Sequence, residues 1–242
     1  MRRCAALLAA LAALPLLGGC DKAPWEDGDD RIETAREFPP ADRPVATITS
    51  TKWSTEEARD RVNEADDVMD SADVRPGMTV ADIGAGDGYY TIRLAPRVGV
   101  SGRVLAQDIQ PEVIERLADR VARERLDNVS LKLGAVDDPR LPADSFDRVF
   151  MVHMYHEIGE PYAFLWRLRP ALRAGGQVIV VDGDRPVAQH GTPFRLLVCE
   201  FEAVGYKLVS YDDKQHAGGY LARFVPDGKR PEPGAITVCK NP

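Results

Sequence analysis

The stretch Val80-Ala81-Asp82-Ile83-Gly84-Ala85-Gly86-Asp87-Gly88-Tyr89-Tyr90 decides the fold of this chain. Its first four residues are mostly apolar and predict a short strand that is buried on both faces. The three glycines that follow at every second position allow a sharp turn and let a ligand approach the backbone closely. A helix that begins after the turn would offer free N–H groups to a polar or anionic part of that ligand.

Asp82 is the unusual residue of this stretch, because it is a carboxylate near the end of a predicted buried strand. A buried carboxylate is costly unless it is paired or binds something. Asp82 would suit a cationic group, such as the ammonium of an amino acid, and it would repel a pyrophosphate.

Length and composition favour one α/β domain. The chain has 242 residues, of which 44% are hydrophobic and 29% charged, which is enough for one domain but little for two. Helical and strand-like segments alternate along it. The formal net charge of −7 argues against a general nucleic-acid binder, which would present a basic surface, so no nucleic-acid partner is expected.

The N-terminus has the composition of an export signal. Residues 1–3 are Met-Arg-Arg, residues 4–17 are an almost unbroken Ala/Leu run, and Gly-Gly-Cys follows at 18–20. The apolar run is shorter than the ~20 residues that span a bilayer. The end of the run resembles a bacterial lipobox. The resemblance implies a signal peptide over 1–19 and lipidation of Cys20. The protein is therefore expected to be an exported lipoprotein that is anchored to a membrane of the bacterial cell envelope. The alternative is an ordinary cleaved signal with an incidental cysteine.

Residues 20–53 are expected to form a lipid-anchored flexible tether, because acidic residues and prolines replace any apolar periodicity. Alternatively, part of this segment packs over the active site through Trp25, Phe38 and Trp53. Two further cysteines, Cys199 and Cys239, could pair in an oxidising compartment. The alternative is that they stay unpaired, with one thiol buried and the other in the tail without a role. Both remain open, because the sequence does not give the distance between the two Cα atoms that a disulfide requires.

The remaining elements follow from periodicity and turn residues. Strands are expected over 78–83, 103–109, 128–133, 147–152, 177–181, 206–211 and 220–225. Helices are expected over 55–71, 89–94, 111–126, 161–172 and 193–204, followed by an irregular tail over 226–242. Ser54 and Glu57 form a capping-box pattern for the first helix, and Pro96 is expected to end the second.

Four segments in order resemble the motifs of class I S-adenosylmethionine-dependent methyltransferases. They are Val80 to Gly88, then Asp108 at the end of the second strand, then Leu-Pro-Ala-Asp-Ser-Phe-Asp at 141–147, and Leu-Arg-Ala-Gly-Gly-Gln-Val at 172–178. The resemblance covers about residues 55–225. It implies a Rossmann-like three-layer sandwich with a mostly parallel seven-stranded sheet and an antiparallel last strand, and a methyltransferase domain over 54–225.

The resemblance also implies S-adenosylmethionine as cofactor, a small-molecule acceptor and a set of binding residues. Asp82 would face the ammonium of the donor, and Asp108 would take the ribose hydroxyls. The other implied contacts are the glycines toward the methionine part, Ile109 beside the adenine, and a residue after the third strand at the adenine amino group: Gly84, Gly86, Gly88, Ile109, Val136 and Asp137. The alternative for Asp108 is a helix cap.

The residues after the fourth strand would face the transferred methyl group in such a fold. His153 and His156 are the catalytic candidates, because they could position the acceptor or take its proton. In a second interpretation His153 and His156, with Glu157, are metal ligands, because the His-x-x-His-Glu spacing resembles inverted zinc-protease patterns. Those patterns also need their own helical context and a further ligand, and no metal is predicted. In the third, His156 is structural. Asp182 and Asp184, after the fifth strand, lie on the rim of the sheet where ligands bind in open α/β folds. They are either pocket residues or ordinary turn acids, and the second interpretation is favoured.

Three functions are compatible with these features. The first is methyl transfer to a small molecule. The second is an exported, lipid-anchored protein that binds the nucleotide-like ligand without transfer, because the donor is made in the cytoplasm while the N-terminus directs the chain outward. A nicotinamide-dependent oxidoreductase is disfavoured, since the glycines run G-x-G-x-G and Asp82 stands where a dinucleotide site is usually apolar.

Overall fold

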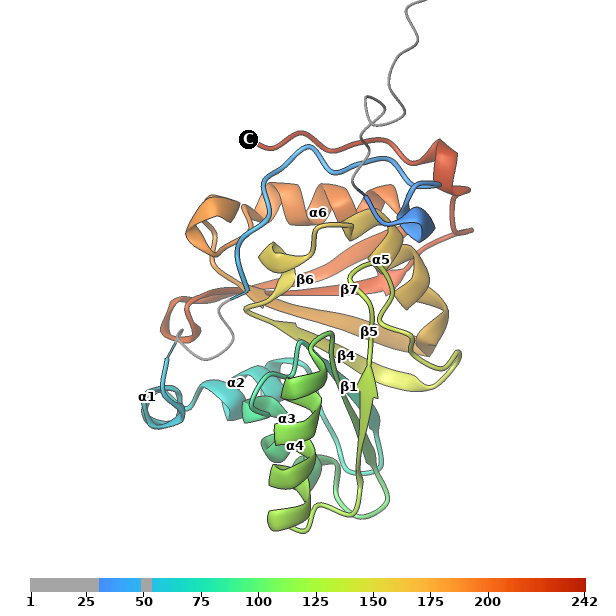
Figure 1. The fold of residues 1–242 in the computed structure, drawn as a ribbon. Helices are drawn as coiled ribbons and strands as arrows, with labels where there is room; N and C mark the ends of the chain where they lie inside the picture. The colour runs from blue at the N-terminus through green and yellow to red at the C-terminus, as the bar shows by residue number, and fades with distance from the viewer. Residues whose placement is uncertain (1–30, 49–53) are drawn as a thin grey trace, which may run out of the picture. The chain divides into compact units, whose positions relative to one another are not determined.

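A seven-stranded sheet forms the centre of the molecule in the computed structural model, which describes residues 31–48 and 54–242 (Figure 1). Residues Ile32–Pro242 form one compact unit. The strand order is β3-β2-β1-β4-β5-β7-β6. The strands are β1 (Thr79–Ile83), β2 (Arg103–Asp108), β3 (Val129–Leu133), β4 (Phe146–Val152), β5 (Leu172–Asp182), β6 (Tyr206–Lys214) and β7 (Gly219–Pro226).

Strands β1 to β5 pair in parallel, and β7 runs antiparallel between β5 and β6. Val180 of β5 and Tyr211 of β6 both pair with Ala222 of β7. The sheet therefore confirms the expected α/β, Rossmann-like architecture with an antiparallel strand near the end of the chain.

Helices cover both faces of the sheet and make three layers (Figure 1). They are α1 (Glu56–Arg61), α2 (Glu64–Ser71), α3 (Tyr89–Val98), α4 (Pro111–Arg123), α5 (Pro161–Leu168) and α6 (Phe194–Ala203). One core lies between the sheet and α2 and α3, with Met69, Leu94 and Phe150 fully buried. The other lies on the opposite face under α5 and α6, where Leu165 and Phe201 are fully buried.

The first helical region differs from the single helix expected over 55–71. It breaks at Val62 and Asn63, where Asn63 adopts a left-handed φ of 54° and Val62 is 42% exposed. Asparagine tolerates this conformation better than other non-glycine residues. Thr55, rather than Ser54, caps α1 by accepting a hydrogen bond from the N–H of Ala58 at 3.2 Å.

Pro96 does not end α3 as expected, because the helix continues to Val98. Ala95 and Val98 are both buried in this last turn. Their packing against the sheet outweighs the hydrogen bond that proline removes.

Residues 32–48 pack on the domain and are not a free tether, although the composition predicts one. Phe38 is 2% exposed and meets the ring of Trp166 edge-on, with ring centroids 5.5 Å apart. The Arg43 guanidinium donates to Glu200 of α6 at 2.8 Å, and both side chains are fully buried. We call residues 32–48 the strap. The alternative expectation places part of the segment over the active site with Phe38 among its anchors; in the structure Phe38 is an anchor, and it packs on Trp166 of α5.

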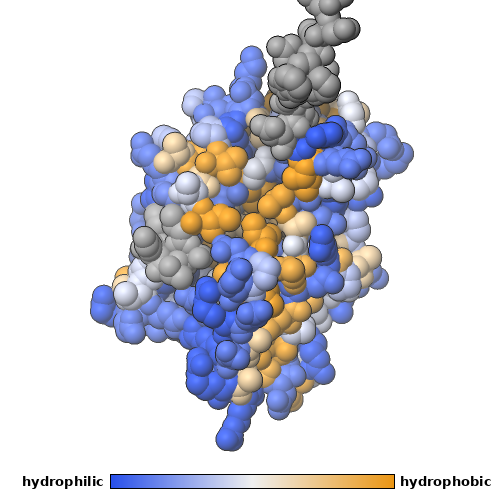
Figure 2. All heavy atoms as spheres, in the orientation of Figure 1, coloured by the Kyte–Doolittle hydropathy of each residue, from blue (hydrophilic) through white to orange (hydrophobic). Residues whose placement is uncertain are grey.

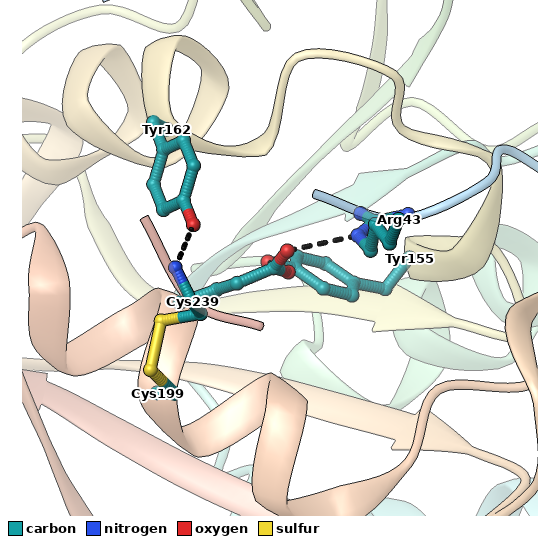
Figure 3. Close-up of a disulfide and its surroundings, with 6 residues drawn as sticks. Arg43, Tyr155, Tyr162, Cys199 and Cys239 are labelled. Carbon is teal, nitrogen blue, oxygen red and sulfur yellow. Dashed lines mark hydrogen bonds and ion pairs between the residues drawn. A yellow bond between two sulfur atoms is a disulfide. The ribbon is translucent and has the colours of Figure 1, made fainter. Parts of the chain in front are cut away.

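The C-terminal tail also packs on this side of the molecule, beside the strap (Figure 1). Asp42 of the strap forms a parallel bridge with Lys240 of the tail. Cys239 is bonded to Cys199 of α6, with Cα atoms 5.9 Å apart, and its N–H donates to the Tyr162 hydroxyl at 2.7 Å (Figure 3). The compact unit therefore extends beyond the expected domain of 54–225 at both ends.

The signal peptide expected over 1–19, the lipidation expected at Cys20 and the tether up to residue 30 lie outside the described residues. Trp25 and Trp53 also lie outside them. Within residues 31–48 and 54–242, the structure has no helix that is both long and apolar enough to cross a bilayer.

Candidate functional site

The candidate site lies where the carboxyl ends of four parallel strands meet at one edge of the sheet. Ile83 at the end of β1 is in register with Gln107 of β2 and with Met151 of β4, and Val152 is in register with Val181 of β5. In the sheet, β1 lies between β2 and β4. The chain passes from β1 to β2 on one side of β1, and it later returns to form β4 on the opposite side of β1. In open α/β sheets, ligands bind outside the strand ends at such a switch point.

The glycine turn after β1 follows the conformation that its sequence predicts. Gly84, Gly86 and Gly88 all have positive φ, at 66°, 54° and 86°. A Cβ at Gly84 would lie 3.0 Å from Met154, and one at Gly88 would lie 2.4 Å from Leu117 of α4. The turn therefore needs glycine both for its backbone conformation and for the close approach of its neighbours.

Asp108 joins the end of β2 to the glycine turn and to the next helix. One carboxylate oxygen accepts from the N–H of Gly86 at 3.1 Å, and the other accepts from the N–H of Gln110 at 3.0 Å. Asp108 is 6% exposed. The second of these bonds closes a local turn before α4, in which Gln110 is the N-cap residue and no side chain caps the helix. Each carboxylate oxygen can accept a second hydrogen bond.

Asp82 is buried inside β1 and accepts from the hydroxyl of Thr91 in α3 at 2.6 Å. Burial raises the pKa of the Asp82 carboxyl to about 6, against the lowering effects of the Thr91 hydrogen bond and of Arg59. The site thus holds a carboxyl group whose ionised form is poorly solvated, and a nearby cation would favour that form.

The residues expected near an adenine divide into two groups. Ile109 is half-buried and Val136 is 43% exposed, so both offer apolar surface near the end of β2 and after β3. Asp137 is buried, and its carboxylate accepts from the Thr34 hydroxyl of the strap at 2.7 Å and from Arg167 of α5. In this structure Asp137 therefore anchors the strap to the domain.

His153 and His156 follow β4 but face different surroundings. His153 has a left-handed φ of 53°, and its Nε2 lies 3.7 Å from Glu64 of α2. Glu64 also accepts from Arg59 and from the Tyr90 hydroxyl. Burial raises the pKa of Glu64, but His153 and Arg59 together outweigh it and lower the pKa to about 2. His153 therefore belongs to a buried ionic network that holds α2 against the sheet.

His156 is 3% exposed and hydrogen-bonds to Asp182 at the end of β5. Its Nδ1 lies 3.0 and 3.1 Å from the two carboxylate oxygens, and Asp182 is fully buried. Asp182 also accepts from the Thr192 hydroxyl at 2.8 Å and from the N–H of Gly183 at 2.9 Å. The interpretation of Asp182 as an ordinary turn acid is therefore wrong. Its position at the carboxyl end of a central strand, where ligands bind in open α/β sheets, could have identified Asp182 as a site residue from the sequence.

One face of the molecule is mixed in character. Figure 2 shows apolar residues along the middle of the face seen in Figure 1, bordered by hydrophilic residues. A separate hollow is lined by Arg169, Arg173, Gly175 and Arg230. It lies at the opposite end of β5 from Asp182, so it is not part of the candidate site.

Comparison with known proteins agrees with this geometry. Residues 80–176 match the family described as methyltransferase domain, a segment that runs from β1 into β5. The match contains the glycine turn, Asp108 and His156.

Curated relatives share only part of their length with this chain. A nocamycin O-methyltransferase of Saccharothrix syringae is 39% identical over 82 residues, which cover 34% of this chain and 29% of the relative. A ubiquinone/menaquinone biosynthesis C-methyltransferase of Bordetella avium is 34% identical over 118 residues, covering 47% of this chain and 44% of the relative. The chain thus spans less than half the length of these two relatives.

A solved structure supports the fold over a longer stretch. The S-adenosylmethionine-dependent methyltransferase of Aquifex aeolicus superposes with a TM-score of 0.62 at 24% identity. The superposition covers 69% of this chain and 90% of that one. This likeness shows the Rossmann-like methyltransferase fold.

Proposed function

We propose that this protein is an S-adenosylmethionine-dependent methyltransferase. The observation that carries the proposal is the glycine turn between the ends of β1 and β2, with the Asp82 and Asp108 carboxylates on either side. Asp82 would balance the ammonium of the donor, and Asp108 would accept from its ribose hydroxyls while holding the turn in place. Ile109 and Val136 would contact the adenine through apolar surface.

The acceptor is proposed to be a small molecule. The names of these two curated relatives describe O-methylation of nocamycin and C-methylation in ubiquinone/menaquinone biosynthesis, which supports a small-molecule acceptor. A third relative, from Methanothrix thermoacetophila, is named for the O-methylation of protein L-isoaspartate, so a protein acceptor is the alternative outcome. The acceptor of this chain would lie beyond the ends of β4 and β5, where His156 and Asp182 stand.

The donor, when bound, supplies an activated methyl group on its sulfonium. The protein then needs mainly to hold donor and acceptor in line and to exclude water. His156 is the residue proposed to orient the acceptor, because Asp182 fixes its ring. His153 is proposed to act indirectly, through the Glu64 network that holds α2 over the sheet.

Transfer of a labelled methyl group tests this function directly. Purified full-length protein, labelled S-adenosylmethionine and a small-molecule extract should yield labelled product, and Asp108→Asn should reduce the yield. A folded wild-type protein that binds the donor but labels nothing in any extract would contradict methyl transfer.

Such a result would favour a second function, an exported protein that binds the ligand without transfer. Two observations support this alternative. The N-terminus is signal-like, and Asp137 is occupied by Thr34 and Arg167 instead of facing a ligand. Fold alone does not separate binding from catalysis.

We also propose that residues 1–19 are a signal peptide and that Cys20 carries the lipid anchor. This would place the protein in the cell envelope, attached to a membrane. The Cys20→Ala variant should then leave the membrane fraction. If it stays there as fully as the wild type, the lipid anchor is ruled out.

A further inference from the structure

Two histidines and a carboxylate converge beside the ends of β4 and β5. His156 and Glu157 belong to the short helix η2 (Tyr155–Glu157), and His190 follows the short helix η4 (Val187–Gln189). Each of these side chains offers a nitrogen or oxygen atom that lies within 4.8 Å of those of the other two. The rings of the two histidines are 5.6 Å apart and nearly perpendicular.

Asp182 fixes one of these histidines in the state that binds metals. Because its carboxylate contacts Nδ1 of His156, the ring carries its proton there and leaves the Nε2 lone pair for another partner. Metal-binding histidines commonly have such a carboxylate behind them, which sets the tautomer and the ring orientation. Asp182 is fully buried and satisfied by Thr192 and Gly183, so it holds the ring firmly.

His190 is held in place by its own loop. The Arg185 guanidinium donates to the His190 carbonyl at 2.7 Å, and the N–H of Thr192 donates to the Gly183 carbonyl at 2.9 Å. His190 adopts a left-handed φ of 57°, a conformation that costs energy for a residue with a side chain. Its Nδ1 is buried and has no hydrogen-bond partner among the residues that the structure describes.

This combination differs from the set that the His-x-x-His-Glu spacing suggests. His153 faces Glu64 of α2, and His190, which lies 34 positions beyond His156 in the sequence, completes the cluster instead. The sequence pattern alone therefore points to the wrong third ligand.

We propose that His156, Glu157 and His190 bind a divalent transition-metal ion, with Asp182 as the positioning residue for His156. Two imidazoles and one carboxylate suit Zn²⁺ and its first-row neighbours, whereas Mg²⁺ and Ca²⁺ prefer all-oxygen sites. Ligand atoms around tetrahedral zinc lie about 3.5 Å apart, so a side-chain adjustment of about 1 Å would close the cluster.

Three protein ligands leave a fourth position on the ion for an oxygen or nitrogen atom of another molecule. The site stands at the strand ends where the acceptor is proposed to bind. The ion would therefore hold a small molecule through a donor atom and not through an apolar contact. The proposed metal ligands are separate from the glycine turn, which is proposed to bind the methyl donor. Metal binding can therefore be tested independently of methyl transfer.

Calorimetric titration of the metal-stripped full-length protein with Zn²⁺ tests the site, without S-adenosylmethionine present. Cys4→Ser and Cys20→Ser are included, so that no thiol outside the disulfide competes. We expect one equivalent to bind, with His190→Ala and Glu157→Gln each weakening the affinity at least about tenfold. Asp182→Asn should weaken it about 10- to 100-fold through the loss of orientation.

His216→Ala is the matched control, because His216 is a surface histidine that contacts Asp67 at 3.0 Å. It should leave the affinity unchanged. Visible spectra with Co²⁺ should show a tetrahedral site that His190→Ala removes. The proposal is overturned if a folded wild type binds no equivalent of Zn²⁺, or if His190→Ala and Glu157→Gln bind it as tightly as the wild type does.

Discussion

At the scale of single residues, Asp82 makes donor binding depend on pH. Its raised pKa of about 6 means that the free protein holds a neutral carboxyl group below that pH. A cationic ligand prefers the ionised form, so the affinity should rise as the pH rises through 6. Between pH 5 and pH 7 the predicted change in affinity is about tenfold.

Calorimetric titrations with S-adenosylmethionine across this range measure the effect. Asp82→Asn should bind weakly with a flat pH profile, since it cannot ionise. A wild-type affinity that does not change between pH 5 and pH 7 would show that Asp82 does not meet the ammonium. The same raised pKa predicts that the unliganded protein loses stability as the pH rises from about 4 to 6, because the folded state binds the extra proton.

Asp108 carries two roles that substitutions can separate. Asp108→Ala should weaken donor binding by ~1.5–3 kcal/mol through lost charge-assisted hydrogen bonds. Part of that loss would come from the N–H groups of Gly86 and Gln110, which lose their acceptor. Asp108→Asn keeps an acceptor oxygen for one of these two N–H groups and turns its NH2 toward the other. Urea unfolding of both variants, measured beside donor binding, separates the structural loss from the lost contact with the ribose. Unchanged affinity in both variants would remove Asp108 from the site.

At the scale of elements, the packing of the glycine turn against α4 can be tested by matched alanine substitutions. Gly88→Ala should destabilise the protein by about 2–4 kcal/mol, since its φ is 86° and a Cβ there would meet Leu117 at 2.4 Å. Gly228→Ala is the control, because its φ is 55° but nothing lies within 4 Å of the added atom. Urea unfolding should show a loss of only about 1 kcal/mol for Gly228→Ala. Equal losses in the two variants would contradict close packing of the turn.

The sequence predicts all seven strands, because most of them contain a short apolar run next to turn residues. Two strands are longer than expected, since β5 begins at Leu172 and β6 continues to Lys214. Helix ends are predicted less well. The break at Asn63 depends on a left-handed residue that periodicity does not register, and α3 continues past Pro96 because buried neighbours hold its last turn. The glycine turn with Asp82 and Asp108 could be found from spacing alone. The cluster of Asp182, His156 and His190 could not, since it brings together the end of β5 and two short helical segments that meet only in the folded protein.

At the scale of the whole molecule, the strap is held by a buried ion pair. Glu200 accepts from Arg43 at 2.8 Å and from the Tyr155 hydroxyl at 2.6 Å, close to the disulfide (Figure 3). Composition predicts a tether here, because this segment is rich in acidic residues and prolines. The ion pair between one arginine, Arg43, and a buried glutamate forms only in the folded protein, so composition does not reveal it. The strap also reaches the candidate site, where the N–H of Ala46 donates to the His156 carbonyl at 3.0 Å.

Arg43→Ala should therefore cost about 3–5 kcal/mol of unfolding free energy, since it leaves the Glu200 carboxylate buried without its partner. The double variant Arg43→Met/Glu200→Gln should recover much of this loss. Arg75→Ala serves as the surface control, because it removes a largely exposed pair with Asp73 and should leave the free energy of unfolding nearly unchanged. A small loss for Arg43→Ala in chemical unfolding would show that the strap does not depend on this pair.

The central claim is that the glycine turn between Asp82 and Asp108 binds S-adenosylmethionine. Calorimetric titration of the purified protein with this donor tests it most directly. The predicted result is saturable binding at one site per chain, weakened by Asp108→Ala. A folded protein that gives no binding heat with the donor or with its demethylated product would contradict the account.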